Sequence, residues 1–185
     1  MISGIVLAAG RGSRFGGTKQ LAVLDGRPLV LHGVAALRDA GVAEIVVVTG
    51  HHADAVEAIL PADVRVVRNA AYLDGQATSL AAALHALDPS SEGAVVLMAD
   101  QPGVTQSDVA SLIETFGASR SRIVRLRYID GPGPALLSRE VYAEAGHLHG
   151  DVGARVLIAS HPDWVEDVDV DRAAPRDIDE PADLP

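Results

Sequence analysis

The chain has no cysteine, 3% aromatic residues and one lysine, Lys19, among its 15 lysine and arginine residues. Without cysteine there is no disulfide and no thiolate metal site, which fits a cytoplasmic protein. No apolar run approaches the ~20 residues of a membrane span, and no charged-then-apolar signal segment opens the chain. We therefore expect a cytoplasmic protein without a membrane partner.

Positive charge is also scarce. The formal net charge is −10, with acidic residues concentrated between Asp163 and Asp183, so the chain has no broad basic face for nucleic acid. Its 185 residues suit one domain, residues 1–185. Because 48% of residues are hydrophobic and few are aromatic, we expect a core of alanine, valine and leucine.

Apolar runs of strand length alternate with stretches of helical period. The runs 45–48 and 95–98 are apolar without alternation, which is typical of strands buried on both faces of a parallel sheet. This alternation predicts a three-layer α/β/α, Rossmann-like domain with a mostly parallel central sheet. The expected strands are Ile2–Ala8, Glu44–Thr49, Val64–Val67, Ala94–Ala99, Ile123–Tyr128 and Trp164–Val168. The expected helices are Pro28–Asp39, Ala53–Leu60, Ser79–Leu87, Gln106–Phe116 and Ser138–Ala145, with loops at Gly131–Pro134 and His147–Arg155.

The first expected strand opens into a loop rich in glycine and cations. Residues 10–19 contain four glycines together with Arg11, Arg14 and Lys19. A buried strand that ends in such a loop presents backbone N–H groups and positive charge, which bind phosphates. Because arginine is the cation almost everywhere else, Lys19 is a candidate for a role that needs a compact, mobile charge.

Two familiar phosphate loops do not fit this segment. The dinucleotide pattern G-x-G-x-x-G meets Phe15 at its last glycine, and the second strand ends at Thr49-Gly50 without an acid for a ribose. The P-loop pattern fails because Thr18 separates Gly17 from Lys19.

Asp100 directly follows the most apolar strand. A carboxylate at the carboxyl end of a central strand can hold a divalent cation beside the glycine loop, and Pro102 fixes the turn that follows it. The alternative is an Asx turn before a proline.

A third group of residues lies between Asn69 and Leu80. Asn69 follows a strand, Gly75 permits a close approach, and Ser79 is a candidate N-cap for the next helix. Such a helix start could read a base edge or a sugar. An ordinary loop and cap is the alternative.

Residues 7–19 meet every fixed position of L-A-[AG]-G-x-[GS]-x-R-[MF]-G-x-x-K. This pattern resembles the signature of the MobA-like NTP transferases, which have a molybdenum-cofactor-transferase-like fold of the nucleotide-diphospho-sugar transferase type. The resemblance implies catalytic roles for Arg14, Lys19 and Asp100. It also implies a nucleotide site made of Leu7, Ala8, Ala9, Gly10, Arg11, Gly12, Lys19, Asn69, Gly75 and Ser79.

The end of the chain resembles the closing D-[IV]-[DN]-T-P-E-D-L element of the same family. The match makes Asp179 the second magnesium ligand beside Asp100, although Glu180 replaces the usual threonine and Ala182 the usual glutamate. The alternative is a solvated acidic tail.

The closest resemblance is to the molybdenum cofactor cytidylyltransferases, because of Ala9, Gln20, the Asp-Gln-Pro element at 100–102 and the Gly-Ala-Arg element at 153–155. It implies that Mg²⁺ is the cofactor, CTP the nucleotide and molybdopterin or molybdenum cofactor the acceptor, with a molybdoenzyme or its chaperone as a partner. The implied acceptor-binding residues are Gln101, Gly150, Asp151 and Arg155. Val152 replaces the lysine usual in this element, and Arg125, Arg127 and Arg155 are candidates to substitute for it.

Other interpretations remain open. Related enzymes transfer guanylyl groups to molybdenum cofactor or phospholactate, or activate sugar phosphates or methylerythritol phosphate. A nucleotide-binding regulator without turnover and a redox enzyme that uses a dinucleotide belong to other classes. The histidine pairs at 51–52 and 147/149 lack an assigned third ligand for zinc.

Overall fold

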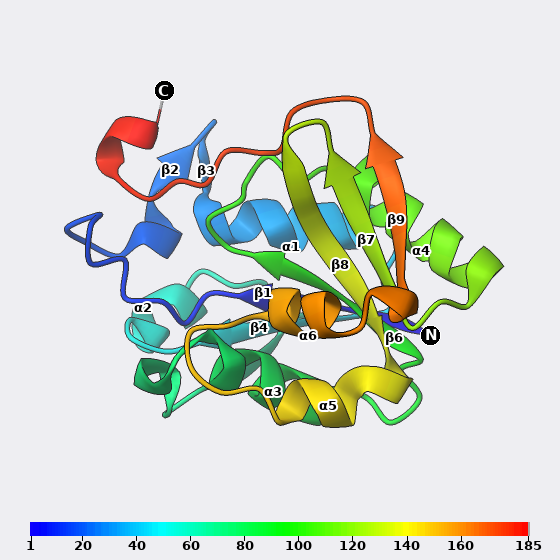
Figure 1. The fold of residues 1–185 in the computed structure, drawn as a ribbon. Coiled ribbons are helices and arrows are strands. Elements are labelled where there is room, and N and C mark those ends of the chain that lie inside the picture. The colour runs from blue at the N-terminus through cyan, green and yellow to red at the C-terminus, as the bar shows by residue number, and fades with distance from the viewer. Residues whose placement is uncertain (185) are drawn as a thin grey trace.

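The computed structural model describes residues 1–184, and its centre is a seven-stranded sheet in the order β5-β4-β1-β6-β8-β7-β9 (Figure 1). All neighbouring strands run parallel except where β8 pairs with β6 and β7. The predicted mostly parallel sheet is therefore confirmed. The strands are β1 Ile2–Leu7, β4 Glu44–Thr49, β5 Arg65–Arg68, β6 Gly93–Met98, β7 Ile123–Tyr128, β8 Gly131–Ser138 and β9 Val165–Val170. A separate hairpin joins β2 Val23–Leu24 to β3 Arg27–Pro28.

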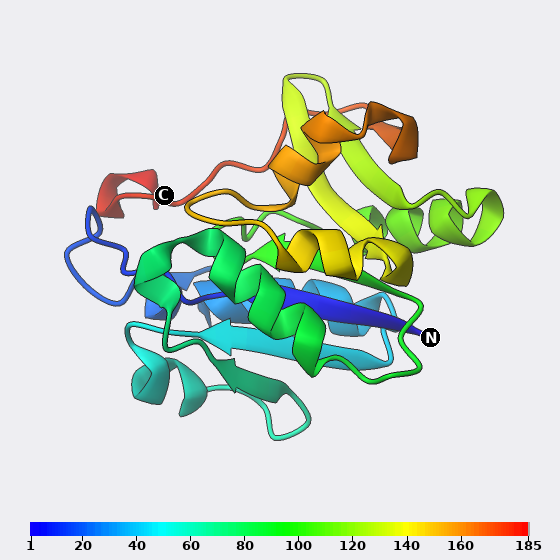
Figure 2. The same cartoon turned by 60° about the horizontal axis from the view of Figure 1, so that its bottom comes forward.

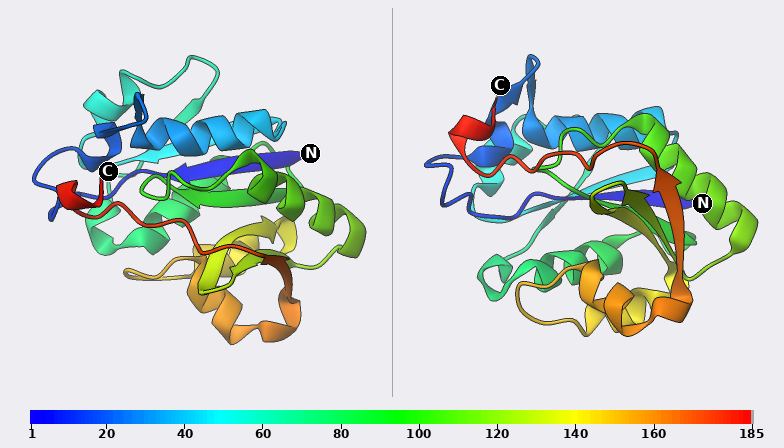
Figure 3. Two further views of the ribbon diagram at one scale, coloured as in Figure 1. Left: turned by 90° about the horizontal axis from the view of Figure 1, so that it is seen from above. Right: turned by 45° about the horizontal axis from the view of Figure 1, so that its top comes forward.

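Helices cover both faces of this sheet, as Figures 2 and 3 show. One face packs against α1 Leu29–Asp39 and α4 Gln106–Ser119, and the other against α3 Gln76–Ala86, α5 Tyr142–Gly146 and α6 Ala154–Ser160. The short helix α2 Ala53–Glu57 follows β4. Single 3-10 turns lie at η1 Lys19–Leu21, η2 Tyr72–Asp74, η3 Arg139–Val141, η4 Pro162–Trp164 and η5 Pro181–Asp183. No helix within residues 1–184 has the length and apolarity to cross a membrane.

Alternation along β1 explains the two cores. Val6 faces the core under α1 and α4, whereas its neighbours Ile5 and Leu7 face the core under α3, α5 and α6. Successive side chains of a strand point to opposite faces. Because both faces of the central strands are covered, their sequences are apolar without interruption.

The carboxyl ends of β1, β4 and β6 lie at one edge of the sheet. Past these ends, the Ala8 amide donates to Val48 O at 2.9 Å, and the Ala99 amide donates to Leu7 O at 3.1 Å. The segments that follow the three strands therefore gather at this edge, the usual ligand-binding edge of an open α/β sheet.

Two expectations about the second half of the chain are wrong. Gly131–Pro134 is the start of β8 and not a loop, and Ser138 ends that strand where a helix was expected to start. The prolines fit because β8 pairs with β6 only from Ala135 onward. Pro132 and Pro134, which have no backbone N–H, therefore do not have to donate a hydrogen bond to β6. Gly133 is required by close packing, since a Cβ there would lie 2.4 Å from the Tyr128 ring.

Smaller differences concern helix starts. Gln76 begins α3 with Gly75 as its N-cap residue, so Ser79 lies inside the helix and is not its N-cap. Ala154 begins α6, so the expected loop 147–155 ends earlier. Gly75 has φ +109°, a conformation that glycine adopts without strain, and this allowed the helix to start one turn earlier.

Candidate active site

The side chain of Gln20 anchors the glycine loop by hydrogen bonds. This buried side chain, 4% exposed, donates from Nε2 to the carbonyls of Ala8 at 3.0 Å and Gly10 at 2.6 Å. Gly12 and Gly16 have positive φ values, and the Phe15 amide closes a turn onto Gly12 O at 2.9 Å. Hydrogen bonds within the chain therefore define the shape of the loop at Ala8, Gly10 and Gly12.

Lys19, Asp100 and Asp179 form one charged cluster beside this loop. Lys19 Nζ donates to Asp100 Oδ2 at 2.8 Å and to Asp179 Oδ1 at 3.0 Å. Arg14 adds a weaker contact, with its guanidinium 3.4 Å from Asp179 Oδ2. The Lys19 side chain is 12% exposed, whereas Asp100 and Asp179 are 24% and 42% exposed. The structure thus brings together the cation and the two carboxylates that the sequence singled out.

Burial and the carboxylates act in opposite directions on Lys19. Burial lowers the pKa of its ammonium, but the hydrogen bonds and charges of Asp100 and Asp179 outweigh burial and raise that pKa above 10.5. Lys19 is therefore charged at neutral pH, and it can neutralise an anion.

The closing segment reaches this cluster through three consecutive residues. Gln101 Nε2 donates to Asp177 Oδ1 at 2.8 Å, and the Ile178 amide donates to Asp100 O at 2.9 Å. Asp179 then makes its contacts with Lys19 and Arg14. The red segment passes beside the blue glycine loop in both views of Figure 3. The segment is therefore attached to the site and is not a solvated acidic tail.

Asp183 fixes the turn that carries Asp179. Its Oδ2 accepts from the amides of Glu180 at 2.8 Å and Asp179 at 2.9 Å, and these bonds lower the pKa of Asp183 below its usual 3.8. The turn η5 forms although Glu180 and Ala182 depart from the family pattern.

A cavity of about 470 Å³ lies between the glycine loop and the start of α3. Ser79 and Gly75 line it, together with Tyr72. Asn69 does not line it, because its Nδ2 donates to Thr78 Oγ1 and Ser79 Oγ, and its Oδ1 accepts from the Ala71 amide. Asn69 therefore shapes the wall from behind. The end of β1 contributes Leu7, and the loop contributes Ala9, Gly10, Arg11, Gly12 and Ser13.

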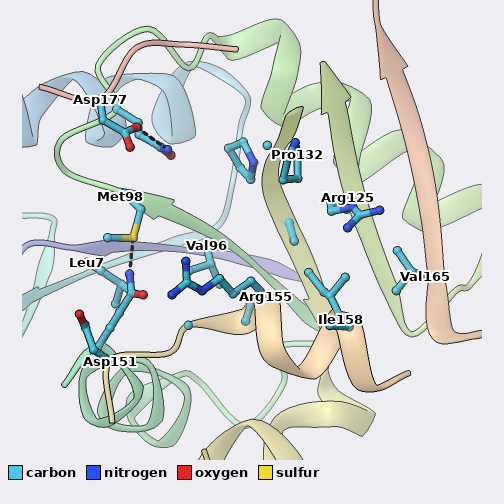
Figure 4. A pocket seen from close by; sticks show the side chains of 18 of the residues that line it. Leu7, Val96, Met98, Arg125, Pro132, Asp151, Arg155, Ile158, Val165 and Asp177 are labelled. Carbon is cyan, nitrogen blue, oxygen red and sulfur yellow. Dashed lines mark hydrogen bonds between the residues drawn. The ribbon is translucent and has the colours of Figure 1, made fainter. Parts of the chain in front are cut away.

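A second, larger cavity of about 840 Å³ adjoins the first (Figure 4). Arg14, Gln101, Asp151 and Arg155 line it, and Arg155 extends from α6 toward Val96 and Leu7 in the close-up. Gly150 lies outside this lining, and it packs against Gly75 so closely that a Cβ on Gly75 would lie 2.1 Å from the Gly150 carbonyl carbon. Asp151 borders both cavities.

The arginines proposed to replace the missing lysine differ in their pairing. Arg125 makes two hydrogen bonds to Asp167, at 2.7 and 2.9 Å, and Arg127 binds Asp169 at 2.6 Å. Arg125 lines the larger cavity, as Arg155 does, and Arg127 does not. Within residues 1–184, Arg155 makes no salt bridge and is the arginine in this cavity that could bind a ligand anion without exchanging an acidic partner.

Sequence reasoning missed Gln76 and Asp177. Gln76 borders both cavities and donates to Met98 Sδ at 2.8 Å, a contact that Figure 4 marks with a dashed line. Gln76 directly follows Gly75 in the sequence, and this position could have marked it as a candidate site residue. Asp177 could have been noticed two residues before Asp179, but nothing in the sequence pairs it with Gln101.

Residues 4–165 match the model of the MobA-like NTP transferase domain. Nicotine blue oxidoreductase of Paenarthrobacter nicotinovorans is 29% identical over 188 residues, which cover 96% of this chain and 92% of that protein. The crystal structure of Rv0371c from Mycobacterium tuberculosis H37Rv has a TM-score of 0.89 at 34% identity, and the match covers 98% of this chain and 94% of that one.

Two further structures bear on the site. Rv0371c in complex with manganese has a TM-score of 0.82 at 31% identity, covering 96% of this chain and 91% of that one. A nucleotidyl transferase from Methanothermobacter has a TM-score of 0.82 at 26% identity, covering 99% and 94%. The family model spans most of the chain and these structures share its whole fold, so the protein belongs to the MobA-like NTP transferase family, with the nucleotide-diphospho-sugar transferase fold.

Proposed function

We propose that this protein is a metal-dependent nucleotidyltransferase that transfers a nucleoside monophosphate from a nucleoside triphosphate to a phosphorylated acceptor, with release of pyrophosphate. The observation that carries the proposal is the convergence of Lys19, Asp100 and Asp179 beside the glycine loop. A cavity of nucleotide size lies next to the loop, and a larger cavity adjoins it. Family membership supports the same chemistry.

The reaction needs positioning and charge neutralisation more than covalent participation by the protein. An oxygen of the acceptor phosphate attacks the α-phosphorus, forms the new P–O bond there, and pyrophosphate leaves with the electron pair of the broken bond. In this proposal, glycine-loop amides, Arg14 and Lys19 stabilise the negative charge that develops on the phosphates.

The donor set of Asp100 and Asp179 fits a divalent cation. Their oxygens converge on one position, which the Lys19 ammonium marks at 2.8 and 3.0 Å. Residues 1–184 contain no group of three histidine or acidic side chains that could hold a metal, so phosphates and water would complete the shell, as is usual for Mg²⁺. Bound there, Mg²⁺ would neutralise phosphate charge and orient the α-phosphate.

For the substrates, we propose CTP and molybdopterin or molybdenum cofactor, with a molybdoenzyme or its chaperone as the partner. The support is the set of subgroup residues Ala9, Gln20 and Gln101 and the presence of Arg155 in the larger cavity. Arg155 would take the place of the lysine that Val152 replaces. We propose that Asp151, at the border of the two cavities, contacts the acceptor.

A second candidate function is a redox reaction, because the relative that matches over nearly the full length is named an oxidoreductase. Two adjoining cavities could receive a nucleotide and a second organic molecule. The absence of an acid at Thr49-Gly50 for a ribose argues against a dinucleotide bound in the usual way. Binding of NAD(H) or NADP(H) by the purified protein, with no pyrophosphate release, would favour the redox candidate.

The deciding experiment measures pyrophosphate release with Mg²⁺ and molybdenum cofactor, separately with CTP, GTP, ATP and UTP. Release with CTP alone supports the full proposal, and release with another nucleotide keeps the chemistry but changes the base. The protein could instead bind a nucleotide and release no pyrophosphate, either in these four assays or with other phosphorylated acceptors. That result contradicts the transferase proposal and favours a regulator.

Removal of Lys19 or Asp100 tests the site itself. We expect Lys19→Ala and Asp100→Ala each to lower turnover by about 10²–10³-fold, because each removes a charge that stabilises the transition state. Circular dichroism should show an unchanged fold. Arg65→Ala is the matched control, because this exposed arginine pairs with Glu44 away from both cavities. Near-native turnover of either site variant contradicts the assignment.

A further inference from the structure

Lys19 occupies the position that the proposed function gives to a metal ion. Its ammonium lies 2.8 Å from Asp100 Oδ2 and 3.0 Å from Asp179 Oδ1, at contact distance from both carboxylates at once. A divalent cation between the same two oxygens would lie close to the ammonium, and two positive charges at such a distance repel strongly in a partly buried site. The two cations therefore compete for these two oxygens.

The backbone around Lys19 is fixed, but its ammonium can move. The 3-10 turn is closed by the Leu21 amide on Thr18 O at 2.9 Å and the Ala22 amide on Lys19 O at 3.0 Å. Gln20 anchors the next residue to the glycine loop. The lysine stem has four rotatable bonds, so the ammonium can change partner while the backbone stays in place.

The space beside the glycine loop offers the ammonium a second position. The Lys19 stem packs on Gly12, where a glycine Cβ would lie 2.9 Å from Lys19 Cβ. A small cavity of about 90 Å³ lies on this side and is lined by Gly10, Gly12, Lys19 and Asp100 among others. Phosphate oxygens on the glycine-loop amides would therefore lie within reach of the ammonium.

We propose, building on the proposed function, that Lys19 is a placeholder for the metal, and that the metal–nucleotide complex moves its ammonium from the two carboxylates to the phosphates. Without nucleotide, a metal has to displace a hydrogen-bonded ammonium that gains no new partner. With nucleotide, the phosphates become that partner. Metal and nucleotide binding are thus positively coupled, and the coupling resides in Lys19.

The test measures the binding of Mn²⁺ alone by electron paramagnetic resonance, without nucleotide. Lys19→Met keeps most of the stem and removes the charge, so we expect it to bind Mn²⁺ about tenfold or more tightly than the wild type, within the usual range of coupling between sites. Adding Asp100→Asn to this variant should abolish the gain, which places the ion at the carboxylates.

Arg14→Met is the matched control for a general loss of positive charge. Arg14 lies 3.4 Å from the same Asp179 but does not bridge the two carboxylates. We expect its effect on Mn²⁺ affinity to be several-fold smaller. Equal or weaker Mn²⁺ binding by Lys19→Met, an equal gain in Arg14→Met, or a gain that survives Asp100→Asn overturns the proposal.

A second measurement uses the fact that Lys19 is the only lysine. Lysine labelled with ¹³C at Cε gives one side-chain resonance in the full chain. We expect Mg²⁺ with CTP to shift this resonance, and Mg²⁺ alone at the same concentration to shift it much less. No shift with Mg²⁺ and CTP, under conditions where CTP binding is detected, overturns the proposal.

These readouts separate the two proposals. Both follow binding and neither requires turnover, so tighter Mn²⁺ binding by Lys19→Met in a protein that releases no pyrophosphate supports the placeholder and contradicts the transferase. If the wild type releases pyrophosphate but Lys19→Met binds Mn²⁺ no more tightly than the wild type does, the transferase proposal is supported and the placeholder proposal is overturned.

Discussion

At the scale of single residues, Gly75 lies where two distant segments of the chain pack against each other beside the cavities. Its φ of +109° begins α3, and its missing side chain lets Gly150 and Asp151 lie against it. The segment that carries Asp151 is thereby placed at the border of the two cavities. This glycine therefore allows the segment around residue 75 and the segment around residue 150 to pack against each other.

We expect Gly75→Ala to lower the free energy of unfolding by about 3 kcal/mol, because backbone strain and overpacking add at this position. The added Cβ would lie 2.1 Å from the Gly150 carbonyl carbon, and no flexible side chain is there to yield. Urea unfolding measures the change.

Two other glycines separate these causes. Gly16 has φ +72° with open space around it, so Gly16→Ala should show backbone strain alone, about 1–2 kcal/mol. Gly117 lies in α4 with open space, so Gly117→Ala should stabilise by about 0.5–1 kcal/mol. A Gly75→Ala effect no larger than that of Gly16→Ala would show that the 150–151 segment moves freely.

At the scale of elements, the closing segment from Asp177 to Asp183 depends on the site for its own position. Its hydrogen bonds run to Gln101, to the Asp100 carbonyl and to Lys19, and one acidic side chain, Asp183, shapes its final turn. The segment is exposed along much of its length apart from the buried Ile178, and these polar contacts attach it to the site.

We expect Asp183→Ala to reduce turnover by up to about 10²-fold, because Asp179 would no longer be held in a defined orientation. Asp183→Asn keeps an oxygen that can accept the two amide hydrogen bonds, so it should restore most of the activity. Pyrophosphate release at saturating nucleotide measures both. The melting temperature should change little in either variant, and a large drop would assign Asp183 a structural role instead.

The elements show where sequence reasoning succeeds. β1, β4 and β6 were predicted within one or two residues, because burial on both faces requires unbroken apolar runs. β8 was missed because glycine and proline at 131–134 indicate a turn. These residues are acceptable in a strand because β6 does not pair with this part of β8, so no backbone N–H is needed on that side. That absence of pairing is a property of the assembled sheet.

The site divides in the same way. The proximity of Asp100 to the glycine loop follows from the rule that parallel strands end at one edge. Asp179 follows no strand of that edge, and 160 residues separate it from Lys19, so only the resemblance to a known family placed it. The hydrogen bonds that withdraw Asn69 from the cavity could not be predicted, because they depend on how the 69–79 turn closes on itself.

At the scale of the whole molecule, three groups govern behaviour at alkaline pH. Burial raises the pKa of Tyr128 from 10 to about 12 and raises that of Tyr142, and the carboxylates raise that of Lys19 against the effect of its burial. Above pH 10 the two tyrosines ionise in the unfolded chain but stay protonated in the folded chain. Ionisation then stabilises the unfolded chain, so the free energy of unfolding falls. The Lys19 contribution is complete below pH 10.5 and is lost as pH rises through its higher folded value.

We therefore expect the free energy of unfolding to be level from neutral pH to about pH 9.5 and to fall above pH 10. Tyr128→Phe keeps the ring and removes the ionisable hydroxyl, so its fall should be shallower. Urea unfolding at pH 8 to 11.5 makes the comparison. Parallel curves for the wild type and Tyr128→Phe would show that Tyr128 ionises alike in the folded and unfolded chains.

The ammonium of Lys19, held between two carboxylates and charged at neutral pH, also determines how the protein reacts with acylating reagents. Only a neutral amine attacks such a reagent, and within residues 1–184 the other primary amine is the α-amino group of Met1, which lies near Glu92 at the opposite end of β1. A dye ester at neutral pH should therefore attach at one defined point, far from the cavities. Fluorescence can then follow ligand binding on a molecule whose site carries no label.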